Sequence, residues 1–181
     1  MLNIQQTIFN VQHNEDCHYL CNNMSKDITY QIAQTEAAFE QGRQLFTAYV
    51  QSLGVDLSFQ DFDHELQLIN QQYHQPAGAL LLAYDNTEPI GCVGIRKIDH
   101  ETAELKRMYV QDKYRGYGIG VQLLEQSMQI ARELGYKKIR LDTLKTMTKA
   151  QALYRAVGFY EIAPYRFNPL EGAIYMEKEL Y

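Results

Sequence analysis

Cysteine is scarce in this chain, which has three thiols among its 181 residues, Cys17, Cys21 and Cys92. Three cysteines cannot all pair within one chain, and none of them lies in a Cys-x-x-Cys motif. This usage is typical of a reducing compartment, in which thiols stay free. We therefore expect a cytoplasmic protein.

Long apolar runs and a basic N-terminal segment are also missing. The longest apolar stretch, "ALLLAY" from Ala79, is far shorter than the roughly 20 residues that span a bilayer. No lysine or arginine precedes Lys26, so the start lacks the basic region of a signal or transit peptide. The sequence predicts a soluble protein with no membrane partner.

An excess of positive charge is absent as well, because 22 acidic residues outnumber 17 basic ones and give a formal net charge of -5. Non-specific binding to nucleic acid needs a basic surface, so we expect no nucleic-acid partner. The length suits one domain with a real core, and the sequence shows no internal repeat, linker or low-complexity tract. It is compatible with a monomer or a homodimer.

Residues 1–26 are polar and mostly aperiodic, and we interpret them as an N-terminal appendage to a domain over 27–181. Two histidines and two cysteines cluster in this appendage: His13, Cys17, His18 and Cys21. Their spacing matches no standard zinc finger. A polar arm with incidental histidines and cysteines is the favoured interpretation, and we expect no metal.

The first half of the domain shows helical and then strand-like periodicity. Residues 28–34 resemble a strand, and apolar residues over 36–53 recur at helical spacing up to Gly54. A second helix is expected near Ser58, which forms a candidate capping box with Asp61. Strand patterns over 79–84, 90–98 and 103–110, joined by short turns, then predict an antiparallel meander.

The second half alternates helices and strands. A helix ends at Gly135, and a strand, a short helix and two strands follow over 137–144, 148–157, from 159 onward and 173–180. A strand, a helix and a second strand in succession imply a parallel crossover. The fold class is therefore α/β (α+β), a single mixed and mostly antiparallel sheet with flanking helices and one parallel β-α-β crossover.

The stretch "YRGYGIG" at 114–120 places three glycines and one arginine just before a helix. Such a turn is a ready anion site, because the first helical N–H groups lack partners and the helix dipole is positive there. The dinucleotide fingerprint fails, since Val121 stands where its third glycine belongs, and the P-loop fails because no Gly-Lys-Ser/Thr follows. An R-x-x-G-x-G phosphate turn and a plain glycine-rich loop remain as alternatives.

The segment "AELKRMYVQDKYRGYGIGVQLLEQSMQIARELGYKKIRLDT", followed by "ALYRAVGF", resembles the GCN5-related N-acetyltransferase (GNAT) family. The similarity is close over about residues 90–160, and the strand order from 27 to 181 is compatible with it. The resemblance implies a GNAT-like acyl-CoA N-acyltransferase fold and acetyl-CoA (coenzyme A) as co-substrate. It also implies transfer of the acetyl group to a primary amine of a small molecule or a protein.

The resemblance assigns the donor contacts residue by residue. The amides of the turn would hold the pyrophosphate, and the preceding strand would pair with the pantetheine arm. These residues are Arg115, Gly116, Tyr117, Gly118, Ile119 and Gly120 in the turn, and Met108, Tyr109 and Val110 in the strand. One position departs from the family, because Met147 stands where an asparagine often contacts the cofactor. That contact is then absent or comes from Thr148 or Lys149.

Acetyl transfer needs a proton acceptor, because a lysine-type ammonium has a pKa of about 10.4. The resemblance implies Glu104 as this base, acting directly or through water, whereas a solvated strand carboxylate paired with Lys106 is the alternative. A backbone N–H near Val110 would polarise the thioester carbonyl.

The resemblance also implies Tyr154 as the acid beside the leaving sulfur. Proton transfer from a phenol to the thiolate is uphill by roughly 2 kcal/mol, so Tyr154 would donate a hydrogen bond rather than protonate it first. A core-facing helix residue, spaced with Ala150 and Val157, is the alternative.

Two groups of residues are candidates for the acceptor site: Asp61, Asp63 and Glu65 in "QDFDHEL", and Tyr165, Arg166 and Asn168 in "PYRFNPLEG". The carboxylates could attract an amine or simply favour a helix start. Arg166 could instead hold the carboxylate of an amino-acid acceptor. The sequence leaves these readings open.

Two other functions compete with catalysis. One is a non-catalytic acyl-CoA-binding sensor module, which needs neither Glu104 nor Tyr154. The other is a nucleotide hydrolase, for which the sequence lacks the phosphate-binding lysine and the metal-binding residues.

Overall fold

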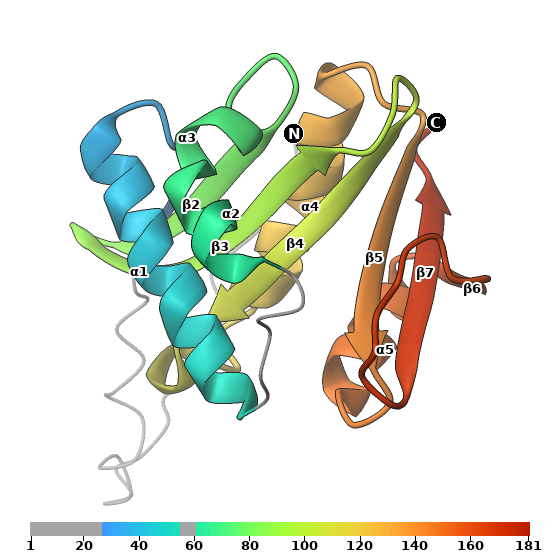
Figure 1. Cartoon of the computed structure of the whole chain (residues 1–181). Helices are drawn as coiled ribbons and strands as arrows, with labels where there is room; N and C mark the ends of the chain where they lie inside the picture. Colours follow the sequence, from blue (N-terminus) through green and yellow to red (C-terminus); the bar gives the residue numbers. More distant parts are fainter. Residues whose placement is uncertain (1–26, 55–60) are drawn as a thin grey trace, which may run out of the picture.

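The computed structural model describes residues 27–54 and 61–181, and within them one seven-stranded mixed sheet is flanked by helices on both faces (Figure 1). The strands are β1 (Ile28–Ile32), β2 (Ala79–Asp85), β3 (Glu88–Lys97), β4 (Thr102–Val110), β5 (Lys138–Leu144), β6 (Tyr160–Ile162) and β7 (Ala173–Glu179). The helices are α1 (Glu36–Leu53), α2 (Phe62–Gln67), α3 (Ile69–Gln72), the 3-10 helix η2 (Asp112–Tyr114), α4 (Ile119–Glu133) and α5 (Thr148–Ala156).

The strand order is β1-β2-β3-β4-β5-β7-β6, which confirms the predicted fold class. Strands β1 to β4 form an antiparallel meander, and α4 connects β4 to the parallel strand β5. Strands β7 and β6 then add on in antiparallel pairs. The appendage, with its four candidate zinc ligands, lies outside the described residues.

Most helix ends lie where the sequence predicts them. The Thr35 hydroxyl accepts a hydrogen bond of 3.2 Å from the N–H of Ala38 at the start of α1. Gly54 ends this helix with φ 63, a left-handed conformation that favours glycine. Gly135, at φ 89, follows the end of α4 in the same way.

The second helix differs from the expected single element. Ser58 lies outside the described residues, and Asp61 is the N-cap residue of α2 without a capping hydrogen bond from its side chain. Leu68 leaves the helical conformation and separates α2 from α3. Since Ile69 and Tyr73 are fully buried against the sheet, tertiary packing outweighs helical continuity here.

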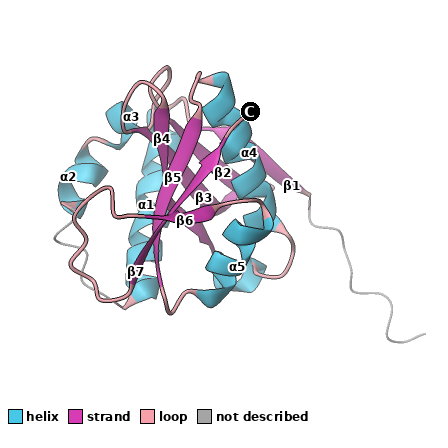
Figure 2. Cartoon of the chain, turned by 90° about the vertical axis from the view of Figure 1, so that its right-hand side faces the viewer, coloured by secondary structure: helices cyan, strands magenta, loops and turns pink. Residues whose placement is uncertain are grey.

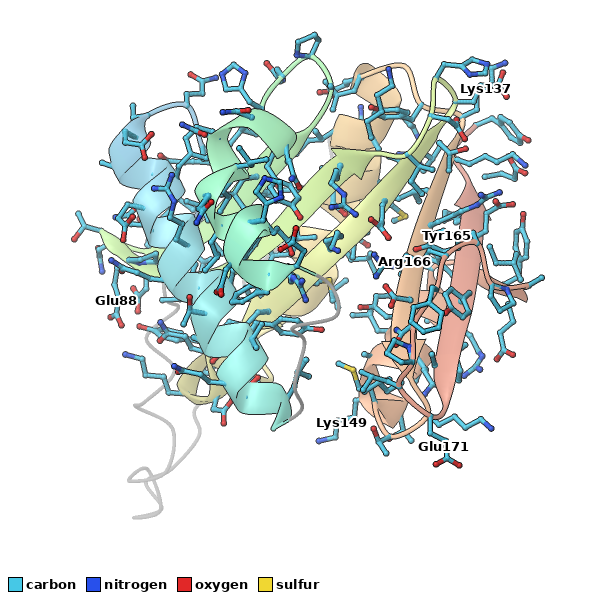
Figure 3. All side chains as sticks on the ribbon, in the orientation of Figure 1. Glu88, Lys137, Lys149, Tyr165, Arg166 and Glu171 are labelled. Carbon is cyan, nitrogen blue, oxygen red and sulfur yellow. The ribbon has the colours of Figure 1, made fainter. Side chains whose placement is uncertain are left out.

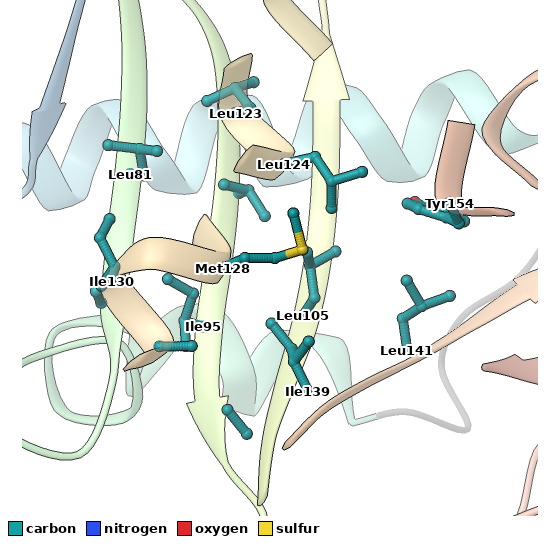
Figure 4. Packing of buried hydrophobic residues seen from close by; sticks show 14 of the residues in the cluster. Leu81, Ile95, Leu105, Leu123, Leu124, Met128, Ile130, Ile139, Leu141 and Tyr154 are labelled. Atoms are coloured by element: carbon teal, nitrogen blue, oxygen red, sulfur yellow. The ribbon is translucent and has the colours of Figure 1, made fainter. Parts of the chain in front are cut away.

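Two hydrophobic clusters cover the two faces of the sheet. On the face of α4 and α5, Leu124 and Met128 pack against Leu105 and Ile139 (Figure 4). On the other face, α1 and α3 cover alternate residues of β2 and β3, among them Leu80, Leu82 and Cys92. Figure 2 shows the sheet between these two layers of helices.

The ladder between β4 and β5 is short. Only Thr102–Glu104 pairs with Lys138–Arg140, and the two strands diverge beyond these residues (Figure 1). The register of β4 against β3 also shifts between Cys92 and Gly94, at a bulge where Arg107 has φ 55. The second half of β4 therefore has a neighbour on its β3 side but none of the described strands on its β5 side.

Candidate active site

A cleft of about 830 Å³ opens where β4 and β5 diverge. Its walls come from α1, the end of β4, the glycine turn and the start of α5. The lining residues are Tyr49, Ser52, Leu53, Met108, Tyr109, Val110, Tyr114, Arg115, Gly116, Gly118, Ile119, Gly120, Val121, Thr146, Met147, Thr148, Lys149, Ala150 and Leu153. The strand and the turn that the sequence singles out thus face one cavity. Among the residues predicted to contact acetyl-CoA, Tyr117 is the one that does not line this cleft, and its side chain is exposed.

The glycine turn leaves its backbone accessible. Gly116 and Gly118 have φ values of 90° and 78°, in the left-handed region that disfavours side chains. Apart from the adjacent backbone, no heavy atom of the described residues lies within 4 Å of the positions that a Cβ would take at Gly116, Gly118 or Gly120. Gly118 is the N-cap residue of the 15-residue helix α4, so the unpaired N–H groups of its first turn face an open approach.

Arg115 fastens the turn to the end of β4. Its Nε donates a hydrogen bond of 3.3 Å to the carbonyl oxygen of Val110, and its Nη2 lies 2.8 Å from a carboxylate oxygen of Asp112. The Arg115 side chain therefore holds the end of β4 and the turn before α4 in one arrangement. These are the two parts of the larger cleft, called the donor cleft below, that are predicted to contact acetyl-CoA.

A smaller recess of about 50 Å³ adjoins the cleft and shares Tyr49, Leu53 and Met147 with it. Its remaining lining comes from β4, β5 and the loop at 163–172: Leu105, Lys106, Arg107, Asp142, Thr143, Leu144, Arg166, Asn168 and Leu170. Figure 3 shows Tyr165 and Arg166 beside the gap between β4 and β5. The recess thus continues the cleft into the split of the sheet.

The carboxylate of Glu104 is buried at the last residue of β4 that pairs with β5, with 1% of the residue exposed. It accepts hydrogen bonds of 2.6 Å from Arg96 Nη2 and 2.9 Å from the Tyr165 hydroxyl, and Arg166 Nη1 lies 3.1 Å away. The alternative from the sequence was a solvated carboxylate ion-paired with a neighbour such as Lys106. Glu104 is ion-paired, but it is buried and its partners are Arg96 and Arg166, so the solvated part of that alternative is wrong. Two guanidinium groups and a phenol from distant segments surround Glu104 instead.

This environment keeps Glu104 ionised. Burial opposes its charge, but Lys106, Arg166 and Arg96 together outweigh burial and hold the pKa of Glu104 below its usual range. A carboxylate with a lowered pKa is a weak proton acceptor. The role of Glu104 as the base stays a prediction.

The three acceptor candidates of the C-terminal loop converge on the split. Arg166 donates to Asp142 of β5 as well as approaching Glu104, and Asn168 Nδ2 donates a 2.8 Å hydrogen bond to Asp142. The ring of Tyr165 packs edge-on against Tyr175, with centroids 5.5 Å apart. The loop therefore links β4 to β5 through side chains where their backbone ladder has ended.

The helical carboxylates do not join this group. Asp61 and Asp63 are exposed and line neither cavity, and Asp61 pairs with His64 at 3.1 Å. Glu65 is buried and accepts a 2.5 Å hydrogen bond from Arg107 and a second bond from Tyr73. Their acceptor role stays a prediction, and the geometry favours the helix-start interpretation for the two aspartates.

Tyr154 belongs to α5, and its side chain is part of the hydrophobic cluster on that face of the sheet (Figure 4). Its ring centroid is 5.8 Å from that of Phe159. Its hydroxyl makes no hydrogen bond with any described residue, and the residue is not part of the cavity lining. Burial raises its pKa, and the nearby Tyr49 and Asp142 raise it further. Both neighbours line the recess, whereas Tyr154 itself lines neither cavity. Its role as the acid stays a prediction.

Sequence reasoning missed several residues of the site: Tyr49, Arg96, Lys106 as a recess residue, Arg107 and Asp142. Strand periodicity offered a partial signal, because "ELKR" and "RLD" place charges inside strands that must be mostly buried. It could not reveal which charges pair, since the partners lie far apart in the chain.

Two further expectations concern absent features. Within the described residues, no group of three or more histidine, cysteine, aspartate or glutamate side chains is arranged to hold a metal ion. Over the same part of the chain, no helix has the length and apolar character needed to cross a bilayer.

The sequence matches the family model described as "Acetyltransferase (GNAT) family" over residues 40–159. It is 36% identical over 140 residues to an uncharacterized N-acetyltransferase of Schizosaccharomyces pombe, covering 76% of this chain and 86% of that protein. It is also 35% identical over 128 residues to an IAA acetyltransferase of Azospirillum brasilense, covering 69% of this chain and 82% of that protein.

Solved structures show the same fold. An acetyltransferase from Streptococcus agalactiae superposes with a TM-score of 0.70 at 22% identity, covering 84% of this chain and 98% of its own. A GNAT family acetyltransferase from Elizabethkingia anophelis, solved with acetyl-CoA bound, has a TM-score of 0.56 at 26% identity, covering 84% and 98%. The split sheet, the glycine turn and these similarities agree, and the chain belongs to the GNAT family of acetyltransferases.

Proposed function

We propose that this protein transfers the acetyl group of acetyl-CoA to a primary amine of a small molecule or a protein. The observation that carries the proposal is that the free edge of β4 and the glycine turn face one cleft. Acetyl-CoA is the co-substrate, as it is the bound ligand in the Elizabethkingia anophelis structure. The cytoplasmic location and the oligomeric state stay predictions.

The cleft fits this donor in two places. The turn from Arg115 to Gly120 offers helix N-terminal N–H groups with open space around its glycines, which suits a pyrophosphate. On its β5 side, the stretch from Met108 to Val110 pairs with none of the described strands and can hydrogen-bond an extended chain bearing amides, such as pantetheine.

Met147 lines both cavities at the position where the family often has asparagine. Its sulfur accepts a 3.6 Å hydrogen bond from Thr143, and it cannot replace an amide toward the donor. Thr146, Thr148 and Lys149 line the cleft beside it. We assign the missing polar contact to Thr148 or Lys149.

In the reaction, a C–N bond forms between the amine and the thioester carbon while the C–S bond breaks. The amine loses a proton, and the sulfur leaves as a thiolate. A backbone N–H near Val110 would stabilise the developing oxyanion. Tyr154 would donate to the thiolate, and Glu104 would accept the proton directly or through water.

The recess favours an enzyme over a sensor module. A sensor needs only the donor cleft, whereas this cleft continues into a second cavity lined by charged side chains from three segments. A nucleotide hydrolase is disfavoured because the turn carries no phosphate-binding lysine.

The test measures donor binding and turnover separately. Calorimetry with acetyl-CoA tests the cleft, and thiol release across amino acids, polyamines, aminoglycosides and lysine peptides tests catalysis. We expect saturable binding and thiol release with one amine class. Binding without release by any amine would favour the sensor module, and tighter binding of ATP than of acetyl-CoA would favour the hydrolase.

A further inference from the structure

The recess beside the donor cleft contains an excess of positive charge. Seven charged side chains meet at or around it: Arg96, Lys106, Arg107, Arg166, Glu65, Glu104 and Asp142. Each of the three carboxylates already has an arginine partner. Arg107 pairs with Glu65, Arg96 and Arg166 pair with Glu104, and Arg166 also pairs with Asp142. Four cations therefore face three carboxylates, and Lys106 is the cation left over.

Lys106 is buried and acts on Glu65 and Glu104 only from beyond ion-pair distance. Only 5% of the residue is exposed, it lines the recess, and its ammonium makes no hydrogen bond or ion pair with any described residue. Burial, opposed in part by Glu65 and Glu104, lowers its pKa to about 8. A buried charge without a partner is costly, so an anion that entered the recess would be strongly stabilised.

A second hydrogen-bond donor beside the recess also lacks an acceptor. Arg166 uses its two terminal nitrogens on Glu104 and Asp142, while its Nε is buried and has no acceptor within the described part of the chain. Buried donors in folded proteins nearly always have a partner. Arg166 and Lys106 come from different segments, and both leave donor capacity unused beside one small cavity.

We propose that the recess binds the carboxylate of the acetyl acceptor, so that the acceptor is an amine that also carries a carboxylate, such as an amino acid. Lys106 provides the counter-charge, and Arg166 Nε provides a further hydrogen bond. The proposal deepens the N-acetyltransferase function proposed above and rests on it.

The size and position of the recess support this class of acceptor. Its volume of about 50 Å³ exceeds the roughly 10–15 Å³ that one water molecule needs on the same measure, so it has room for a small polar group such as a carboxylate. It opens to the donor cleft at Tyr49, Leu53 and Met147. A carboxylate held there leaves the amine of the same molecule to extend toward the cleft.

The charge of the recess also selects against other amines. A polyamine would bring a second ammonium toward Lys106 and Arg107, where like charges repel.

The test compares amino acids with their own carboxamides and their decarboxylated amines in the thiol-release assay. In the wild-type protein we expect kcat/KM for each acid substrate to exceed that of its carboxamide by about tenfold or more, because a charge-assisted contact is lost in the amide. Lys106→Met, similar in length but uncharged, should raise KM for the acids by about tenfold and leave KM for the carboxamides nearly unchanged.

Two variants serve as controls. Lys106→Arg retains the charge and should restore much of the preference for acids. Lys97→Met removes an exposed lysine at the end of β3 and should change nothing. Acetyl-CoA binding, measured by calorimetry in every variant, should stay constant because Lys106 does not line the donor cleft.

The outcomes separate the two proposals. Equal turnover of acids and carboxamides, or preferred turnover of polyamines or lysine peptides, would overturn the carboxylate recess and leave the acetyltransferase standing. Failure of acetyl-CoA to bind would overturn the proposed function. Titration of the acids into the coenzyme A complex tests the recess without turnover, and absence of binding by every acid would overturn it even in a protein that binds acetyl-CoA.

Discussion

The hydroxyl of Tyr165 donates a 2.9 Å hydrogen bond to the carboxylate of Glu104, across 61 positions of the sequence. The bond joins the loop at 163–172 to β4 at the last residue pair of the β4–β5 ladder. Arg166, the next residue, reaches both Glu104 and Asp142. Side chains thus take over the connection between the two strands at the point where backbone pairing ends.

Replacing Glu104 by glutamine should destabilise the protein, because Arg96 and Arg166 would lose a buried counter-charge. We expect the free energy of unfolding to fall by about 3 kcal/mol, as measured by urea denaturation. Glu161→Gln, which breaks an exposed pair with Arg155, should change it by less than about 0.5 kcal/mol. Similar stability losses in both variants would contradict a buried role for Glu104.

The contribution of Glu104 should depend on pH in a defined direction. Its pKa is lower in the folded than in the unfolded protein, because the neighbouring cations outweigh burial. The stabilisation is therefore present above the unfolded pKa of about 4.3 and is lost as the pH falls through the folded pKa. The stability difference between wild type and Glu104→Gln should shrink below about pH 4, and a constant difference would contradict the assignment.

Lys106 should also make stability rise with pH, but in an alkaline range. Burial lowers its pKa from 10.5 to about 8, so between these values the unfolded chain binds more protons than the folded one. Stability relative to Lys106→Met should then rise with pH from about 8 to 10, by as much as about 3 kcal/mol. The groups around its ammonium are Glu65, Glu104, Arg96 and Arg107. Urea denaturation across this range measures the effect, and a flat difference would contradict a desolvated ammonium.

Gly118→Val should weaken acetyl-CoA binding. The residue has φ 78, and a branched side chain would both strain the backbone and fill the open approach to the helix N-terminus. We expect the dissociation constant to rise by about tenfold or more in calorimetry. Gly135→Val is the matched control, because it has φ 89 and open surroundings but lies outside the cleft. Equal weakening in both variants would show a folding effect instead of a lost contact.

If Tyr154 is the acid, as proposed, Tyr154→Phe should lower turnover and leave acetyl-CoA binding nearly unchanged, since only the hydroxyl that would donate to the leaving sulfur is removed. We expect kcat to fall by about tenfold or more, measured by thiol release at saturating substrate. Tyr160→Phe removes a hydroxyl that bonds Glu177 outside both cavities and should preserve kcat. Unchanged turnover in Tyr154→Phe would remove this residue from the mechanism.

The sequence was sufficient for features that depend on neighbouring residues. The glycines of the turn, the ends of α1 and α4, and the crossover between β4 and β5 follow from local composition and periodicity. These features could be placed because backbone conformation and helix capping are short-range effects.

Features set by tertiary contacts were not predictable in the same way. The partners of Glu104 come from β3 and from a loop that follows β6, and the sequence around Glu104 does not indicate which residues they are. The break at Leu68 is caused by burial of Ile69 and Tyr73, against the local helical pattern. The unpaired state of Lys106 depends on how every nearby carboxylate is already matched, which only the assembled structure reveals.

Because only three residues of β4 pair with β5, the stability of the folded protein should depend on the concentration of acetyl-CoA. A pantetheine chain on the free edge of β4 would act as a temporary eighth strand and join two halves that otherwise share little backbone. Ligand at 100 times its dissociation constant adds about 2.7 kcal/mol to the stability of the folded state. When the thioester is abundant, the enzyme should resist heat and proteolysis longer than when the thioester is depleted.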